Sequence, residues 1–301
     1  MTFTSNVKNE LCTIENSNIE EISELSAIIR NSYIDKNVIR ITTENIIVAE
    51  RIYRLINKIY GLSPKIVVRR GYNYNKNYLY ILELKEVEMI TKDLDIEVEP
   101  KEYLVADEEQ IKAYLRGLFL IKGSVNDPSK SRYHLEFNVD NLKYANFIIK
   151  LLKNYFIKAK SLKRENNYMI YIKEAEKISD FLKLIGASKA VLYFEDIRIY
   201  RDNANMVNRL NNCEQANVDK IISTAYEQIK AIEKIEKLAS LDILSDKEKE
   251  VAIYRKKYPD VSLVELANIM SIETDKKITK SGIYHRLNKI KEISEKLSNF
   301  D

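Results

Sequence analysis

An internal repeat restricts the possible folds of this 301-residue chain more than any other feature of its sequence. When residues 18–185 are divided into two halves with a period of about 90 to 97 residues, their apolar patterns align. The clearest match is YLYILEL at 78–84 against YMIYIKE at 168–174. Each half gives the order helix, strand, helix, strand, strand, helix. A duplicated α+β domain is therefore expected.

The apolar spacing predicts the elements of each half. In the first half they are Ile19–Ser32, Val38–Thr42, Glu44–Tyr60, Lys65–Arg70 and Tyr78–Leu84. In the second half they are Asp107–Ile121, Tyr133–Val139, Asn141–Phe156, Lys160–Arg164 and Tyr168–Lys173. The helix Glu44–Tyr60 carries Ile47, Arg51 and Leu55 at helical spacing, which predicts one packed face.

After Gly186 the pattern predicts only helices, at Lys189–Arg201, Asn203–Cys213 and Asn217–Leu244. Six asparagines between residues 203 and 217 lower the helix propensity, so this stretch is expected to be a hinge. We expect three parts. They are a duplicated domain at 1–200, with halves of about 18–100 and 101–186, a helical linker at 201–244, and an all-α domain at 245–301.

The helix of the second half ends in LRGLFLIKG, residues 115–123. Gly117 lowers helix stability by about 1 kcal/mol relative to Ala, so close approach of another backbone is expected there. The string resembles the LAGLIDADG motif of homing endonucleases, and LSAIIRNSY at 25–33 stands at the corresponding place in the first half. The resemblance implies two αββαββα halves related by a pseudo-twofold axis, with Ser26 and Ala27 where the motif helices touch.

Catalysis in that family requires a carboxylate at the eighth motif position of each helix, to hold a divalent metal. Here these positions are Ser32 and Lys122, and a charged ammonium group cannot bind a cation. Asp35 and Asp127 lie beyond the motifs, on expected loops. No catalytic residue, metal or cofactor is therefore predicted, and a residual metal-dependent endonuclease that uses Asp35 and Asp127 is the alternative.

The strands of the two halves carry basic residues that suit phosphate contacts. The residues expected to make secondary contacts to DNA are Arg69, Arg70, Lys160, Lys163 and Arg164. Further basic residues at Lys65, Lys76 and Lys158 and tyrosines at Tyr72, Tyr74 and Tyr168 accompany them. An ordinary solvated polar face explains the same pattern equally well. A third hypothesis makes this domain a protein-docking platform without DNA contact.

The last 57 residues have the pattern of a helix-turn-helix domain. SDKEKEVAIYRKKYP starts a short helix at Ser245, and SLVELANIM begins with Ser262 and Glu265, the residues of a capping box. After an expected loop, SIETDKKI, the segment TKSGIYHRLNKIKEISEKL places Ile283, Leu287, Ile290 and Ile293 on one face. The opposite face holds Ser281, Tyr284, His285, Asn288 and Lys291. Such a helix suits the major groove of DNA.

Positive charge is concentrated in this segment. Residues 275–291 hold six basic residues against one acid, a local net charge of +5 in a chain whose total is +4. The residues expected to contact double-stranded DNA are Ser262, Lys276, Lys277, Thr279, Lys280, Ser281, Gly282, Tyr284, His285, Arg286, Asn288, Lys289 and Lys291. A three-helix appendage with a solvated basic face is the alternative.

The two domains together resemble the WhiA family of Gram-positive bacteria. The strings that carry the resemblance are FTSNVKNEL at 3–11, YLRGLFLIKGSVNDPSKSRYHLEF at 114–137, NRLNNCEQAN at 208–217 and ITKSGIYHRLNKI at 278–290. The resemblance implies a non-enzymatic DNA-binding regulator with a degenerate LAGLIDADG domain. It also implies roles in transcription, cell division, chromosome segregation and, in sporulating lineages, sporulation.

Composition sets the remaining expectations. No apolar run approaches the roughly 20 residues of a membrane span, and the N-terminus lacks a secretory signal, so a cytoplasmic, nucleoid-associated protein without membrane contact is expected. The cysteines, Cys12 and Cys213, are too far apart in sequence to suggest a disulfide framework or a zinc site. A monomer is expected because both motif helices lie in one chain. A protein regulator is a further candidate partner.

Overall fold

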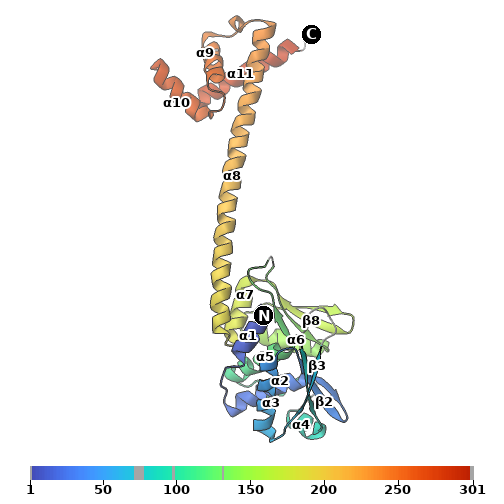
Figure 1. The fold of residues 1–301 in the computed structure, drawn as a ribbon. Coiled ribbons are helices and arrows are strands. Elements are labelled where there is room, and N and C mark those ends of the chain that lie inside the picture. Colours follow the sequence, from blue (N-terminus) through green and yellow to red (C-terminus); the bar gives the residue numbers. More distant parts are fainter. Residues whose placement is uncertain (1, 71–77, 97–98, 131, 299–301) are drawn as a thin grey trace. The chain divides into compact units, whose positions relative to one another are not determined.

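The computed structural model describes residues 2–70, 78–96, 99–130 and 132–298, which form two compact units, 1–202 and 203–301 (Figure 1). The first unit contains α1 (Phe3–Leu11), α2 (Asn18–Arg30), β1 (Tyr33–Asp35), β2 (Val38–Thr43), α3 (Ile46–Tyr60), β3 (Lys65–Arg70), β4 (Tyr78–Leu84), α4 (Val87–Asp93), α5 (Glu108–Lys122), β5 (Gly123–Val125), β6 (Leu135–Val139), α6 (Leu142–Asn154), β7 (Lys160–Arg164), β8 (Asn167–Ile172) and α7 (Ala175–Leu184). α8 (Ser188–Leu238) leads into the second unit, which also contains α9 (Asp246–Lys257), α10 (Leu263–Thr274) and α11 (Lys280–Ser298).

The pseudo-twofold repeat is confirmed by the topology of the two four-stranded antiparallel sheets. Their strand orders are β1-β2-β4-β3 and β5-β6-β8-β7, so each strand has a counterpart in the other half. The sequence pattern missed β1 and β5 because each has only three residues, too few to show an alternating pattern. With these strands included, each half has the order αββαββα.

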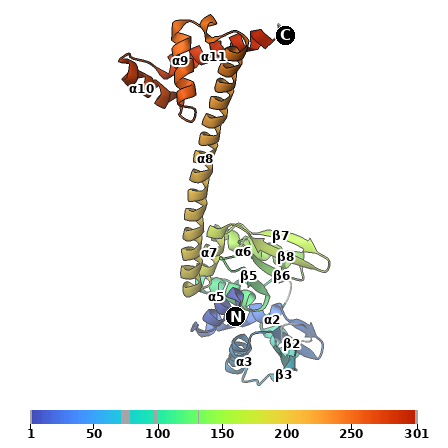
Figure 2. The ribbon, with the colours of Figure 1, turned by 45° about the horizontal axis from the view of Figure 1, so that its top comes forward.

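The helices α2 and α5 lie side by side where the two halves meet (Figures 1 and 2). α5 begins with the expected capping box, in which Asp107 accepts a hydrogen bond from the Gln110 N–H at 2.8 Å. A Cβ atom on Gly117 would overlap the carbonyl oxygen of Glu24 and lie 3.1 Å from the Cβ atom of Ala27. The expected close approach of another backbone at Gly117 is therefore confirmed.

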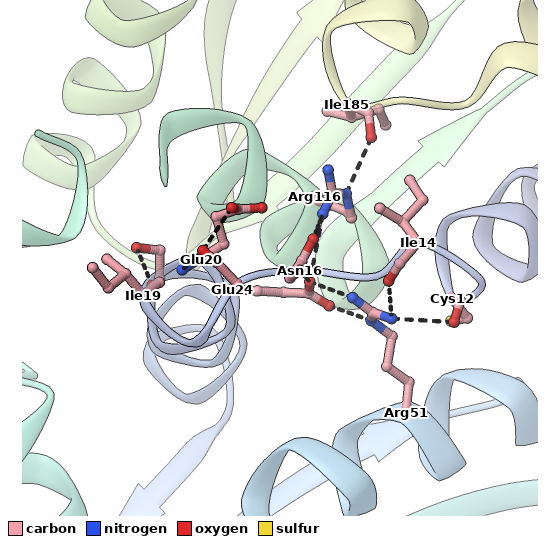
Figure 3. Close-up of polar contacts among 11 residues, drawn as sticks. Cys12, Ile14, Asn16, Ile19, Glu20, Glu24, Arg51, Arg116 and Ile185 are labelled. Carbon is pink, nitrogen blue, oxygen red and sulfur yellow. Dashed lines mark hydrogen bonds and ion pairs between the residues drawn. The ribbon is translucent and has the colours of Figure 1, made fainter. Parts of the chain in front are cut away.

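A buried polar network connects this helix pair to its surroundings (Figure 3). The fully buried carboxylate of Glu24 accepts two hydrogen bonds from Arg51, at 2.6 and 2.7 Å, and one from Asn16 at 2.6 Å. Arg116 donates to Asn16 at 2.6 Å and to the carbonyl of Ile185 at 3.1 Å. The network joins α2, α3, α5 and the end of α7. A buried charge requires such partners, because removing one of them from a pair typically costs 3–5 kcal/mol.

The N-terminal helix α1 is held by contacts distant in sequence. The Thr4 hydroxyl accepts from the Val125 N–H at 2.9 Å and donates to the Val125 carbonyl at 2.8 Å, at the edge strand β5. The Glu10 carboxylate accepts hydrogen bonds from the N–H groups of Lys189 and Ala190, at 2.6 and 3.0 Å. These N–H groups lie in the first turn of α8, where a helix lacks backbone partners of its own. Glu10 therefore caps α8.

The expected division of residues 189–244 into three separate helices is wrong. α8 continues from Ser188 to Leu238 through all six asparagines. Each Asn costs less than about 0.7 kcal/mol relative to Ala, and helix propagation is cooperative, so asparagines alone do not stop a helix as Pro would. No helix in the described part of the chain is long and apolar enough to cross a membrane.

Candidate nucleic-acid interface

The helix pair α10 and α11 forms the basis of the interface. Ser262 accepts a hydrogen bond from the Glu265 N–H at 3.2 Å and its own N–H donates to the Glu265 carboxylate at 2.8 Å, so the expected capping box is present. α10 continues to Thr274, four residues beyond the sequence expectation, and ends at Asp275 in the left-handed conformation, with φ of 51°. The connection to α11 is therefore residues 275–279 instead of the longer loop expected at 271–278.

Ser271 and Thr279 fix this short connection. The Ser271 hydroxyl donates to the carbonyl of Ala267 at 2.7 Å and accepts from the N–H of Ile278 at 3.0 Å. The Thr279 hydroxyl accepts from the N–H of Gly282 at 3.2 Å, which caps the start of α11. Ser262 and Thr279 thus have structural roles in addition to any contact with a ligand.

α11 has the orientation that its apolar spacing predicts. Ile283, Leu287 and Ile290 are buried in a core formed with α9, α10 and the end of α8. The core includes Ile232 and Ile235 of α8, so a fragment that begins at residue 245 would lack part of it. On the opposite side of α11, Ser281, Tyr284, His285 and Lys291 are exposed and Asn288 is half-buried. The outer face therefore presents hydroxyl, imidazole and amide groups to solvent.

The basic residues of this region fall into two sets. Lys276, Lys277 and Lys280 are exposed and Arg286 is half-buried, and among the described residues none of these four has an ion pair or a side-chain hydrogen bond. By contrast, Lys289 pairs with Glu248 at 2.8 Å and Lys291 pairs with Glu227 at 3.1 Å. The first set retains its full capacity to bind an anion.

Basic residues also occur at equivalent positions of the two sheets. Arg69 pairs with Leu79 and Arg164 with Asn167, at the same register of β3–β4 and β7–β8. Lys65 and Lys160 are likewise equivalent. These four side chains lie on the sheet faces opposite the core. The residues between them differ in the two repeats, being Ile66, Val67 and Val68 in β3 but Ser161, Leu162 and Lys163 in β7.

The other two sheet candidates, Arg70 and Lys163, lie on the core-side faces of β3 and β7, because side chains alternate along a strand. Tyr168 packs partly against the core and is therefore no free stacking group. Lys158 is exposed in the turn before β7. Tyr72, Tyr74 and Lys76 lie outside the described residues.

The motif positions that bear acids in the endonucleases have other chemistry here. Ser32 donates to the carbonyl of Ile28 at 2.7 Å, and Lys122 is half-buried. The strand register gives an alignment of the two halves that differs from the motif alignment by one residue. Tyr33 lies opposite Arg40 and Ser124 lies opposite Glu136, so Tyr33 and Ser124 are equivalent. In this alignment Lys122 corresponds to Asn31. Neither alignment gives a carboxylate.

Asp35 and Asp127 are occupied by local hydrogen bonds. Asp35 accepts from the Lys36 N–H at 2.8 Å. Asp127 accepts from the Ser129 hydroxyl at 2.6 Å and the Ser129 N–H at 2.9 Å, and the hydrogen bond from the hydroxyl holds the pKa of Asp127 below its ordinary value. Within the described ranges, no three His, Cys, Asp or Glu residues lie close enough together to hold a metal ion.

The fold therefore defines a two-part protein, a doubled LAGLIDADG-type α+β domain followed by a helical helix-turn-helix unit. Three models of protein families match this chain, and together they cover nearly all of it. The WhiA N-terminal LAGLIDADG-like domain matches residues 18–97, the WhiA LAGLIDADG-like domain matches 111–204 and the WhiA C-terminal HTH domain matches 207–294.

Relatives of similar length share this organisation. A probable cell division protein WhiA of Oceanobacillus iheyensis is 42% identical over 311 residues, covering 99% of this chain and 98% of the relative. The protein of the same name from Staphylococcus aureus strain JH9 is 41% identical with the same coverage. The crystal structure of full-length DUF199/WhiA from Thermatoga maritima is 29% identical with a TM-score of 0.60, and the match covers 98% of this chain and 99% of that one. The chain belongs to the WhiA family.

Proposed function

We propose that this chain is a non-enzymatic DNA-binding regulator that acts in cell division. The observation that carries the proposal is the set of unpaired basic residues, Lys276, Lys277, Lys280 and Arg286, in the turn and first half of α11. Basic side chains at this position suit contacts to DNA phosphates on both sides of a major groove. The names of the relatives support the role in cell division.

The outer face of α11 supplies the groups that would read the sequence. Ser281, His285 and Asn288 can donate to or accept from base edges, and Asn is suited to a bidentate contact with adenine. Tyr284 is 49% exposed and its ring lies 5.8 Å from that of His285, so the pair presents an apolar surface with polar edges. A helix with both phosphate-binding and base-reading groups favours sequence-specific binding over purely electrostatic binding.

The binding experiment compares the intact chain with its Lys280→Ala/Arg286→Ala variant across a range of salt concentrations. Loss of two phosphate contacts should weaken binding and reduce the slope of log K against log[salt] by about two units. Lys247→Ala is the matched control, since Lys247 is an exposed lysine on α9 of the same unit. Equal slopes for all three proteins would refute the assignment of α11 as the recognition helix.

We further propose that the protein regulates transcription on the nucleoid and contributes to chromosome segregation and, if the host forms spores, to sporulation. Genome-wide mapping of bound DNA tests this role. A few sharp peaks at promoters are expected. Broad coverage without promoter peaks would replace the transcriptional role with that of a nucleoid-associated protein.

A further inference from the structure

The middle of α8 has no packing partner in the described structure. All side chains of residues 203–220, hereafter the exposed segment of α8, are solvent-exposed. Most helices in proteins gain their stability by packing an apolar face against a partner. Asparagines further lower the propensity of the exposed segment. A partner that covers one face would supply the missing stabilisation.

The charge of the exposed segment argues against DNA as that partner. Arg209 and Lys220 are balanced by Glu214 and Asp219, which gives a net charge of zero, two basic minus two acidic residues. A surface that binds the phosphate backbone needs a clear excess of basic side chains. The partner must therefore be recognised by the apolar residues of the exposed segment and by a balanced pattern of charge.

An apolar stripe with coiled-coil spacing runs along the exposed segment. Met206, Leu210 and Cys213 are exposed, the first two at 63% and 55%, and Asn203 and Asn217 extend the stripe at both ends. The intervals along these five positions are three, four, three and four residues, the a and d spacing of a two-stranded coiled coil. We propose that the stripe pairs with the same stripe of a second copy of this chain, in a parallel coiled coil over residues 203–217.

The polar residues favour a parallel pair of two helices. Asn203, Leu210 and Asn217 occupy a positions, and a buried Asn at this position fixes register and a two-stranded state at some cost in stability. Arg209 then lies at a g position and Glu214 at the following e position, so Arg209 of one copy faces Glu214 of the other. An antiparallel pair sets g against g and loses this opposite-charge contact.

The pairing departs from the monomer that the sequence predicts. That expectation concerns only the motif helices, α2 and α5, which already pair within one chain. It does not involve the exposed segment of α8. With only about two heptads, the pair is weak, and each paired assembly would carry two helix-turn-helix units.

Cys213 provides a direct test because it lies at a d position, where a parallel pair brings like residues face to face. A disulfide requires Cα atoms about 4.4–6.8 Å apart. In the full-length Cys12→Ser variant, Cys213 is the remaining thiol, and diamide accepts the two hydrogen atoms as the disulfide forms. A linked dimer on a non-reducing gel is expected.

The matched control moves the thiol to the opposite side of the same helix. In Cys12→Ser/Cys213→Ser/Gln215→Cys the thiol lies two residues further along, about 200° around the helix axis. Its cross-linking should be at least tenfold slower. Leu210→Lys in the Cys12→Ser chain should slow the linkage at Cys213 by a similar factor, since it places like charges at the centre of the stripe. Equal rates in the three proteins would overturn the proposal.

A second measurement avoids any change at the buried Cys12. Sedimentation velocity of the unmodified chain over a range of concentrations should show a sedimentation coefficient that rises with concentration. The Leu210→Lys chain should stay monomeric at the same concentrations and keep both hydrophobic cores folded, because Leu210 belongs to neither core. A monomer at every concentration of the unmodified chain would also overturn the proposal.

Discussion

The carbonyl oxygen of Glu24 occupies the space that a Cβ atom on Gly117 would need. The same residue, Glu24, also binds Arg51 through its side chain. Glu24 therefore belongs both to the close packing of α2 against α5 and to the buried ionic network. Changes at the helix contact should disturb both.

Gly117→Ala should lower the free energy of unfolding of the first unit by about 1–3 kcal/mol, because the added methyl group overpacks the contact with α2. Helix propensity alone predicts the opposite sign, since Ala is favoured over Gly by about 1 kcal/mol. Urea unfolding of the intact chain measures the change. Lys122→Ala, at the end of the same helix, is the control, and a Gly117→Ala protein at least as stable as the unmodified chain would contradict the prediction.

The sheets offer a matched comparison between their two faces. Arg69→Ala/Arg164→Ala removes two equivalent arginines from the faces opposite the core. If the first unit binds DNA together with α11, this variant should weaken binding several-fold and reduce the salt slope by about two units. Arg70→Ala/Lys163→Ala removes two charges from the other faces of the same strands. Identical affinities for both variants and the unmodified chain would favour a docking role for the first unit.

The ion pair between Glu248 and Lys289 should make the second unit sensitive to acid. Burial raises the pKa of Glu248, but hydrogen bonds from Lys289 and from the Ser245 N–H lower it more, so the pKa lies below its ordinary value. The carboxylate therefore stabilises the folded unit fully above its unfolded pKa of about 4.3, and this stabilisation is lost as pH falls through the lower folded pKa. The protection factors of the α9 and α11 amides, which are measured relative to the intrinsic exchange rate at each pH, should fall below about pH 4.

Lys289→Met should weaken this pH dependence and lower the stability of the second unit at pH 7, because Glu248 would lose its partner. Lys291→Met is the control, because Lys291 pairs with Glu227, whose side chain is 65% exposed. If the two substitutions change the protection of the α9 and α11 amides equally, the burial of Glu248 does not strengthen its ion pair. The ion pair also makes Lys289 a poor choice for tests of DNA binding, since its loss changes stability.

Incubation with plasmid DNA and Mg²⁺ or Mn²⁺ should give no cleavage. Asp127 is held by Ser129, Asp35 by its own turn, and both alignments of the motif place neutral or basic residues at the catalytic positions. A two-metal or one-metal mechanism requires carboxylates that converge on the scissile phosphate. Gel analysis of the plasmid provides the measurement, and cleavage that disappears in Asp127→Asn would establish a residual nuclease.

Much of the fold follows from local signals in the sequence. The caps at Asp107 and Ser262 specified where α5 and α10 begin, and the spacing of Ile283, Leu287 and Ile290 specified the buried face of α11. The glycine at 117 indicated close helix packing. Each of these signals involves residues within a few positions of one another, so the sequence alone contains the information.

Other features depend on residues that are distant in sequence. The helical spacing places Arg51 on the packed face of α3, but it does not show that Glu24, 27 residues earlier, binds its guanidinium group. The pairing of Lys289 with Glu248 could not be predicted either, because it requires knowledge of how α9 packs on α11. The strand register is needed to show that Arg69 and Arg70 lie on opposite faces of their sheet.

The capping of α8 by Glu10 joins residues that are separated by about 180 positions along the chain. Since the ribosome produces the chain from its N-terminus, α1 emerges long before the N–H groups of Lys189 and Ala190 exist. Its contact with the edge of β5 must also wait for Val125. During synthesis α1 therefore cannot complete its contacts until Val125 and the first turn of α8 have left the ribosome.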